Sequence, residues 1–153
     1  AGQLDVAATY EPYLSESASK VAGAKVLVSS ADTPGLIVDF LFASEDLVES
    51  RPEVLQAIAK GWFDAVEYWN TNPEEANEIM GAAFEVSAQE MADFKTGVSW
   101  LNLEENKALF DPSSEFNAYD TFELVGDILE ANGGTTLRIR AEDHLTDTII
   151  QSF

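Results

Sequence analysis

The side chains able to do acid–base, nucleophilic or metal chemistry in this chain are almost all carboxylates. Asp and Glu number 28, whereas there is one histidine and no cysteine. A serine triad would have to use His144, and the chain has no Gly-x-Ser-x-Gly nucleophile elbow. His144 falls on the polar side of a predicted C-terminal helix, where an exposed histidine is the simplest interpretation. We therefore predict no catalytic residue.

Metal and phosphate binding have no supporting motif. Thiolate metal sites need cysteine, and no glycine-rich phosphate loop is present. The oxygen-bearing residues from Asp111 onward have the spacing of a calcium loop. However, Phe116 stands where that loop needs glycine, and Phe122 where it needs a bidentate glutamate. The sequence thus predicts no metal site and no cofactor.

The charge balance argues against two classes of partner. Eight Lys and Arg against 28 Asp and Glu give a net charge of -20 and a pI near 4.1. Such a surface repels phosphate backbones and anionic lipid headgroups, so nucleic-acid binding is close to excluded and anionic membranes are disfavoured. The best apolar run, Leu36 to Ala43, is too short to cross a bilayer and carries Asp39. Solubility and adaptation to salt water both remain open as reasons for the acidic surface.

The elements that would position any site begin with three strand-prone segments. These are residues 4–10, 25–29 and 36–43, and a helix over 13–21 separates the first two. The contiguous apolar residues at 26–28 are typical of a strand covered on both faces, as in a parallel sheet. An aspartate at position 39 within an apolar run either points outward at a strand end or faces a polar cavity.

From Ser44 onward the sequence is helical in pattern. Ser44 can cap a short helix, Pro52 fits the first turn of a long one, and Asn72 precedes the next. Ser87 and Glu90 have the spacing of a capping box. The remaining expected helices span 104–110, 116–131 and 142–153. We expect an α/β fold, predominantly helical, with a small three-strand N-terminal βαβ sheet.

An ordered set of motifs resembles a known family. The runs LDVAA (4–8) and YEPYL (10–14) are similar to a segment of bacterial solute-binding proteins that serve nitrate, sulfonate, taurine and thiamine-precursor ABC importers. Tyr10 replaces a commoner tryptophan. Further similar runs follow in order at 25–32, 34–39, 52–57, 62–65, 72–76 and 105–106. The resemblance covers residues 4–110 and matches only the later part of a two-lobed, type II periplasmic binding protein.

The resemblance implies a division of the chain. Residues 1–43 would be the end of the ligand-binding lobe, and residues 44–153 the helical part returning to the other lobe. Together they would form one compact unit. The sheet would lack the strands that complete both lobes, so the chain would be a partial solute-binding protein.

The resemblance also implies a ligand site in the cleft between lobes. The carried-over positions are Tyr10, Glu11, Asp32, Thr33 and Asp39. An aromatic ring offers stacking or cation–π area, and three carboxylates favour an amine-containing or zwitterionic ligand over a bare anion. A sulfonate-type ligand is also within the family's range. The structural alternatives stay open: Glu11 as a turn residue, and Asp32 with Thr33 as a turn or helix cap.

Three functions follow from these observations. The first is capture of a small-molecule ligand for an ABC importer, with the permease as partner, in the periplasm or outside the cell after removal of a signal peptide. The second is a free-standing domain derived from such a protein, which self-associates, as a dimer, through exposed apolar faces and has a protein-interaction role. The third is an enzyme related to pyrimidine synthesis. Such relatives use a histidine in the N-terminal half, which this chain lacks, so we expect no enzyme.

Overall fold

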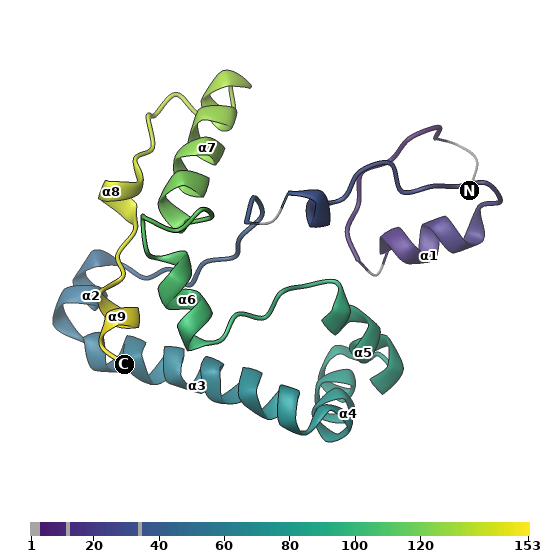
Figure 1. The fold of residues 1–153 in the computed structure, drawn as a ribbon, viewed down its shortest axis with the longest axis horizontal. Coiled ribbons are helices and arrows are strands. Elements are labelled where there is room, and N and C mark those ends of the chain that lie inside the picture. Colours follow the sequence, from purple (N-terminus) through teal and green to yellow (C-terminus); the bar gives the residue numbers. More distant parts are fainter. Residues whose placement is uncertain (1–3, 12, 34) are drawn as a thin grey trace. The chain divides into compact units, whose positions relative to one another are not determined.

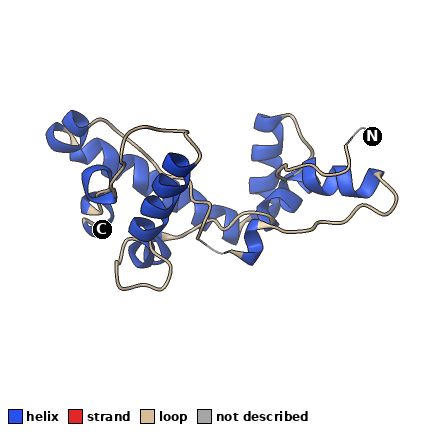
Figure 2. Cartoon of the chain, turned by 90° about the horizontal axis from the view of Figure 1, so that it is seen from above, coloured by secondary structure: helices blue, strands red, loops and turns tan. Residues whose placement is uncertain are grey.

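The computed structural model describes residues 4–11, 13–33 and 35–153, and all regular secondary structure in those ranges is helical (Figure 1; Figure 2). Pro12 and Pro34, which belong to the similar runs 10–14 and 34–39, lie outside the described residues. The helices, in order, are α1 Tyr13–Lys20, the 3-10 turn η1 Ser30–Asp32, α2 Glu45–Ser50, α3 Pro52–Thr71, α4 Pro73–Phe84, α5 Ala88–Thr96, α6 Leu103–Leu109, α7 Ala118–Ala131, α8 Ala141–His144 and α9 Thr148–Gln151.

The expected three-strand sheet is not found, and the α/β prediction is wrong for the part of the chain that the structure describes. Residues 4–10, 25–29 and 36–43 contain no strand. The physical reason is that β-propensity measures how well a residue fits a pleated, half-buried surface, and that surface needs a neighbouring backbone. Here several large apolar side chains of these segments face solvent: Leu27 is 77% exposed and Phe42 is 92% exposed.

The chain divides into two compact units. The first unit joins Ala1–Ser29 with Ala65–Trp100, and the second unit joins Ser30–Asp64 with Leu101–Phe153. Helix α3 contributes its N-terminal part to the second unit and its C-terminal part to the first. Whether residues 1–43 belong to a ligand-binding lobe stays a prediction.

The core of the first unit forms where α3, α4 and α5 meet. Trp69, Ala76 and Met91 are buried there. The indole of Trp69 lies 5.0 Å from that of Trp100, and its Nε1 donates a 2.7 Å hydrogen bond to the Oδ1 of buried Asn77. A buried polar group that has a partner avoids a desolvation penalty of about 1–3 kcal/mol, so this bond fixes the α3–α4 corner.

Aromatic pairs and long-range hydrogen bonds hold the second unit together. The ring of Phe40 meets that of Phe122 edge to face at 6.4 Å, and the ring of Phe63 meets that of Phe153 at 5.8 Å. The hydroxyl of Thr121 donates to the carbonyl of Gly35 at 2.8 Å. These contacts attach residues 35–40 and the C-terminus to the helices, with α7 beside α8 and α6 beside α9 (Figure 1).

Helix starts follow the side-chain caps. Ser44 accepts a bond from the Leu47 amide, and Ser87 with Glu90 forms the predicted capping box. Asn72 takes the predicted N-cap position but makes no capping bond, because its amide nitrogen is turned back to donate to the Tyr68 carbonyl.

The predicted single helix over 142–153 is wrong in the structure. It is two short helices, α8 and α9, separated at Leu145, whose backbone is extended. The hydroxyl of Thr146 accepts a 3.3 Å bond from the Thr148 amide, and such local bonds compete with the helical ladder.

Candidate functional site

Two of the five predicted ligand residues lie in the first unit, at the entry to α1. Tyr10 is 73% exposed, and its ring meets the ring of Tyr13 edge to face with centroids 5.6 Å apart. The carbonyl of Tyr10 accepts a 3.0 Å bond from the Leu14 amide, which ties the start of the helix to this tyrosine. Two open aromatic rings are thereby held together at one helix end.

Glu11 lies between these tyrosines in the sequence and is half-buried. A Cβ added at Gly97 would come within 3.2 Å of the Glu11 Cγ, so the aliphatic part of Glu11 lies against the end of α5. The glycine at position 97 therefore makes room for this side chain. Exposed aromatic rings can bind an organic cation, and a carboxylate can pair with its charge.

Asp32, Thr33 and Asp39 lie in the second unit, and all three are exposed. Asp32 is the last residue of η1, and the Thr33 amide donates to the Ser30 carbonyl at 3.1 Å. Asp39 lies in an extended segment beside half-buried Phe40. The five predicted residues are thus divided between the two units, with Tyr10 and Glu11 in one and the other three in the second.

The sequence analysis missed Tyr13 as a member of the candidate site. Tyr13 is 54% exposed and supplies half of the aromatic pair. The sequence did contain a signal for Tyr13. Tyr10 and Tyr13 are three residues apart, and side chains at that spacing meet on one side of a helix start. We call Tyr10, Glu11 and Tyr13 the tyrosine site.

A separate open depression lies at the junction of α3 and α4. It is lined by residues 71–75 and by Glu78, none of which was predicted as a ligand residue. The hydroxyl of Tyr68 is hydrogen-bonded to Glu75, and this bond raises the pKa of Tyr68 above its ordinary value of 10.0. Acids in the first turn of α4 complement the positive end of the helix dipole, which accounts for their place.

The described residues offer little for catalysis or metal binding. His144 ends α8, and its ring lies 6.0 Å from that of Phe122, so it packs against an aromatic side chain of α7. Asp111 accepts bonds from the Ser113 hydroxyl and amide, at 2.7 Å and 2.8 Å, and these bonds lower the pKa of Asp111. Across residues 4–11, 13–33 and 35–153 no cluster of His, Asp and Glu could hold a metal ion. None of the helices there is long and apolar enough to cross a membrane.

Comparison with known proteins gives one match. Residues 1–83 match the NMT1-like family. The matched range includes the tyrosine site, Asp32, Thr33, Asp39 and all of α3. No curated protein and no solved structure matches the chain significantly. The family match ends within α4, whereas the motifs predicted a resemblance that reached residue 110.

Proposed function

Because the chain belongs to the NMT1-like family, a solute-binding protein family of ABC importers, we propose that it captures a small solute for such an importer. The proposed ligand is amine-containing or zwitterionic, and its ammonium group binds at the tyrosine site. The proposed partner is an importer permease, and the proposed location is the periplasm or the outside of the cell. The proposed activity is binding without turnover.

The observation that carries this proposal is the exposed pair of tyrosine rings, between which Glu11 stands in the sequence. The rings of Tyr10 and Tyr13 are 5.6 Å apart and both are more than half exposed, so a ligand can reach either face. A cation over a tyrosine ring gains about 0.5–2 kcal/mol. The carboxylate of Glu11 adds a charge-assisted hydrogen bond to an ammonium group.

In the second unit, Thr33, Asp32 and Asp39 stay predicted ligand residues in their own right, and each offers a polar group to a solute. The hydroxyl of Thr33 can donate to an acidic headgroup, which a zwitterion carries and a simple amine lacks. Asp32 and Asp39 are the proposed acceptors for amine hydrogens. These three residues are exposed in the described structure, as a ligand site requires.

Thermal unfolding read by tryptophan fluorescence tests the proposal with pairs of compounds that differ only in the amine. Taurine is paired with ethanesulfonate and β-alanine with propionate; nitrate and a pyrimidine thiamine precursor complete the panel. A ligand present at about 100 times its Kd adds roughly 2.7 kcal/mol to the free energy of unfolding. That corresponds to a shift of several degrees for a domain of this size.

Variants locate the binding. We expect Tyr10→Ala and Tyr13→Ala each to weaken amine binding several-fold, and Glu11→Gln to remove the preference for the amine over its deaminated partner. Tyr68→Phe, in the same unit but outside the tyrosine site, is the matched control and should bind as the wild type does. Equal shifts with ethanesulfonate and taurine, or an unchanged affinity in both tyrosine variants, would overturn the proposal.

A second candidate function rests on the exposed apolar side chains of residues 24–43. Val28 is 76% exposed, Ile37 77% and Phe42 92%. Large exposed apolar patches mark interaction surfaces, so a self-associating domain is the alternative. Light scattering separates the two functions: a stable dimer abolished by Leu27→Gln with Phe42→Gln, in a chain that no compound stabilises, would favour self-association.

A further inference from the structure

Helix α7 carries apolar side chains over a wide arc, and the second unit covers part of that arc. On the covered part Ala118 is fully buried, and Phe122 contacts the rings of Phe40 and His144. A Cβ added at Gly126 would lie 3.4 Å from the carbonyl oxygen of Ile139, so residues leading to α8 pack closely here. Figure 1 shows α8 and the segment before it along this side of α7.

The rest of this arc, which continues along the helix beyond Ala118 and Phe122, is open to solvent. Its four members are 39–47% exposed and form two pairs spaced by one helical turn, 124 with 128 and 125 with 129. We call Leu124, Val125, Ile128 and Leu129 the α7 apolar face. Side chains at i and i+4 form a continuous ridge, which is the surface that a second helix packs against.

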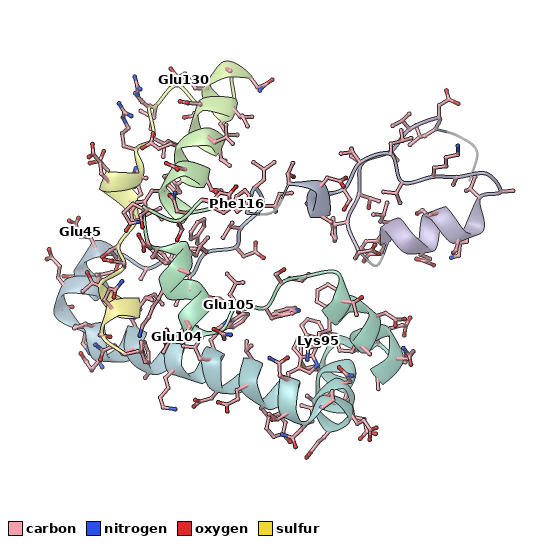
Figure 3. All side chains as sticks on the ribbon, in the orientation of Figure 1. Glu45, Lys95, Glu104, Glu105, Phe116 and Glu130 are labelled. Atoms are coloured by element: carbon pink, nitrogen blue, oxygen red, sulfur yellow. The ribbon has the colours of Figure 1, made fainter. Side chains whose placement is uncertain are left out.

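Acidic side chains lie along one edge of this face, and Arg140, a cation beside α7, is paired with Glu123 of that helix. Asp120 precedes Leu124 by four residues and Asp127 follows it by three, so both carboxylates lie beside Leu124 along one edge. Glu130 lies in the last turn of the same helix (Figure 3). The sequence from 108 to 137 contains no Lys or Arg.

The acidic charge beside the α7 apolar face limits which kind of partner can bind there. A second copy of this chain would bring its own net charge of -20 and the same acidic edge, so like charges would oppose pairing through this face. Nucleic acids and anionic membranes are repelled for the same reason. An occupant that covers the apolar ridge and neutralises its edge must be apolar on one side and basic beside it.

We propose that the α7 apolar face binds a cationic amphipathic helix of a partner protein. The partner's apolar residues would be spaced i, i+3, i+4 and i+7 to pack on the α7 ridge. Its Lys or Arg residues would flank that stripe and lie beside Asp120 and Asp127. This surface is independent of the tyrosine site, which lies in the other unit.

The probe is a fluorescein-labelled synthetic helix with leucines at i, i+3, i+4 and i+7 and lysines flanking them. Two control peptides carry glutamate in place of lysine, or the same residues in scrambled order. We expect the lysine helix alone to raise fluorescence anisotropy when titrated with the full chain. Its affinity should fall as salt is added, because exposed charges are screened at a Debye length of about 10 Å in 0.1 M salt.

Paired variants locate the peptide on the molecule. Leu124→Gln with Ile128→Gln should weaken binding by about tenfold or more, as truncation of interface anchors does. Ile79→Gln with Phe84→Gln removes two exposed apolar side chains from α4 and should leave the affinity unchanged. Asp127→Asn should weaken binding severalfold at low salt, whereas the matched Glu78→Gln should not.

Three outcomes would overturn the proposal. The first is equal binding of the glutamate or scrambled peptide, which would show that the surface does not distinguish peptides by their amphipathicity or charge. The second is an equal loss of affinity in the α4 variants, which would show adsorption to an acidic chain and no defined surface. The third is a dimer seen by light scattering and dissolved by Leu124→Gln with Ile128→Gln, which would make a second copy the occupant.

Discussion

Residues 65–100 and residues 24–43 are both rich in large apolar side chains. The two regions differ in how far those side chains are buried. In the first region Trp69 and Met91 are each 4% exposed, inside a core shared by three helices. In the second, Leu27 and Ile37 are each 77% exposed. A helix satisfies its backbone hydrogen bonds within itself and needs only one packed neighbour. An extended segment needs neighbours for its backbone as well, so its apolar side chains stay open without them.

The difference matters for function because three of the candidate ligand residues, Asp32, Thr33 and Asp39, lie in the open region. All five predicted positions fall between residues 10 and 39, as does Tyr13. Segments with few buried contacts open at the lowest free energy, and binding residues are often found on such segments. The well-packed helices then serve as the scaffold.

The largest expected effect is on the buried tryptophan. Trp69→Ala should lower the free energy of unfolding by about 3–5 kcal/mol, because it leaves a cavity and removes the donor to Asn77. It also removes the ring under the Lys95 ammonium, 5.0 Å from its centroid. Phe42→Ala, from the open region, is the matched control and should change stability by no more than about 0.5 kcal/mol. Urea unfolding followed by circular dichroism measures both, and equal losses would remove the contrast between the regions.

Two helix glycines should respond with opposite signs. A Cβ at buried Gly81 would lie 2.9 Å from the Val86 carbonyl oxygen, so Gly81→Ala must shift the backbone and should cost about 1–3 kcal/mol. Gly61 in α3 has no atom within 4 Å of such a Cβ, so Gly61→Ala should gain about 0.5–1 kcal/mol from helix propensity. Thermal unfolding of the pair tests this, and a destabilised Gly61→Ala would show that α3 packs more closely there than the structure describes.

The smallest expected effect is the pH dependence contributed by the capping box of α5. The Ser87 hydroxyl and amide, 2.7 Å and 2.9 Å from the Glu90 carboxylate, hold the pKa of Glu90 below its ordinary value. The unfolded chain therefore takes up the proton first as pH falls. Glu90 adds stability above its unfolded pKa, about 4.3, and this is lost as pH falls through the lower folded pKa.

Glu90→Gln tests that sign. The variant should show a flatter loss of stability on the acid side than the wild type, measured by urea unfolding at a series of pH values. Glu67→Gln on α3 controls for the loss of one negative charge. If the loss of stability at acidic pH is unchanged in Glu90→Gln and altered in Glu67→Gln, the assignment of this pH dependence to Glu90 is contradicted.

The sequence predicted the helices well because their signals are local. Ser44, Pro52 and Ser87 mark helix starts that the structure confirms, and each acts on residues within one turn. The break between α8 and α9 was missed because Leu145 and Ile149 keep helical spacing while Thr146 and Thr148 bond to each other at 2.8 Å. The periodicity of apolar residues alone does not show that such local side-chain bonds compete with the helical hydrogen bonds.

The strands could not be predicted correctly by the same means. Contiguous Val26, Leu27 and Val28 fit a buried strand, but pairing depends on residues far away or on another chain. The candidate site was half predictable: Tyr10 and Glu11 came from motif resemblance, whereas Tyr13 needed the ring geometry. The family itself was predictable from motif order, and the match over residues 1–83 confirms it.

The most direct test of the account is hydrogen–deuterium exchange of the full chain with and without the zwitterion that most raises its unfolding temperature. The account predicts that the ligand slows exchange at residues 10–14, around the tyrosine site, and leaves the already protected helices α4 and α5 unchanged. Slowed exchange confined to residues 71–78 would place the ligand in the acidic depression instead. That result, or no change anywhere in a chain that binds the compound, would contradict solute capture at Tyr10, Glu11 and Tyr13.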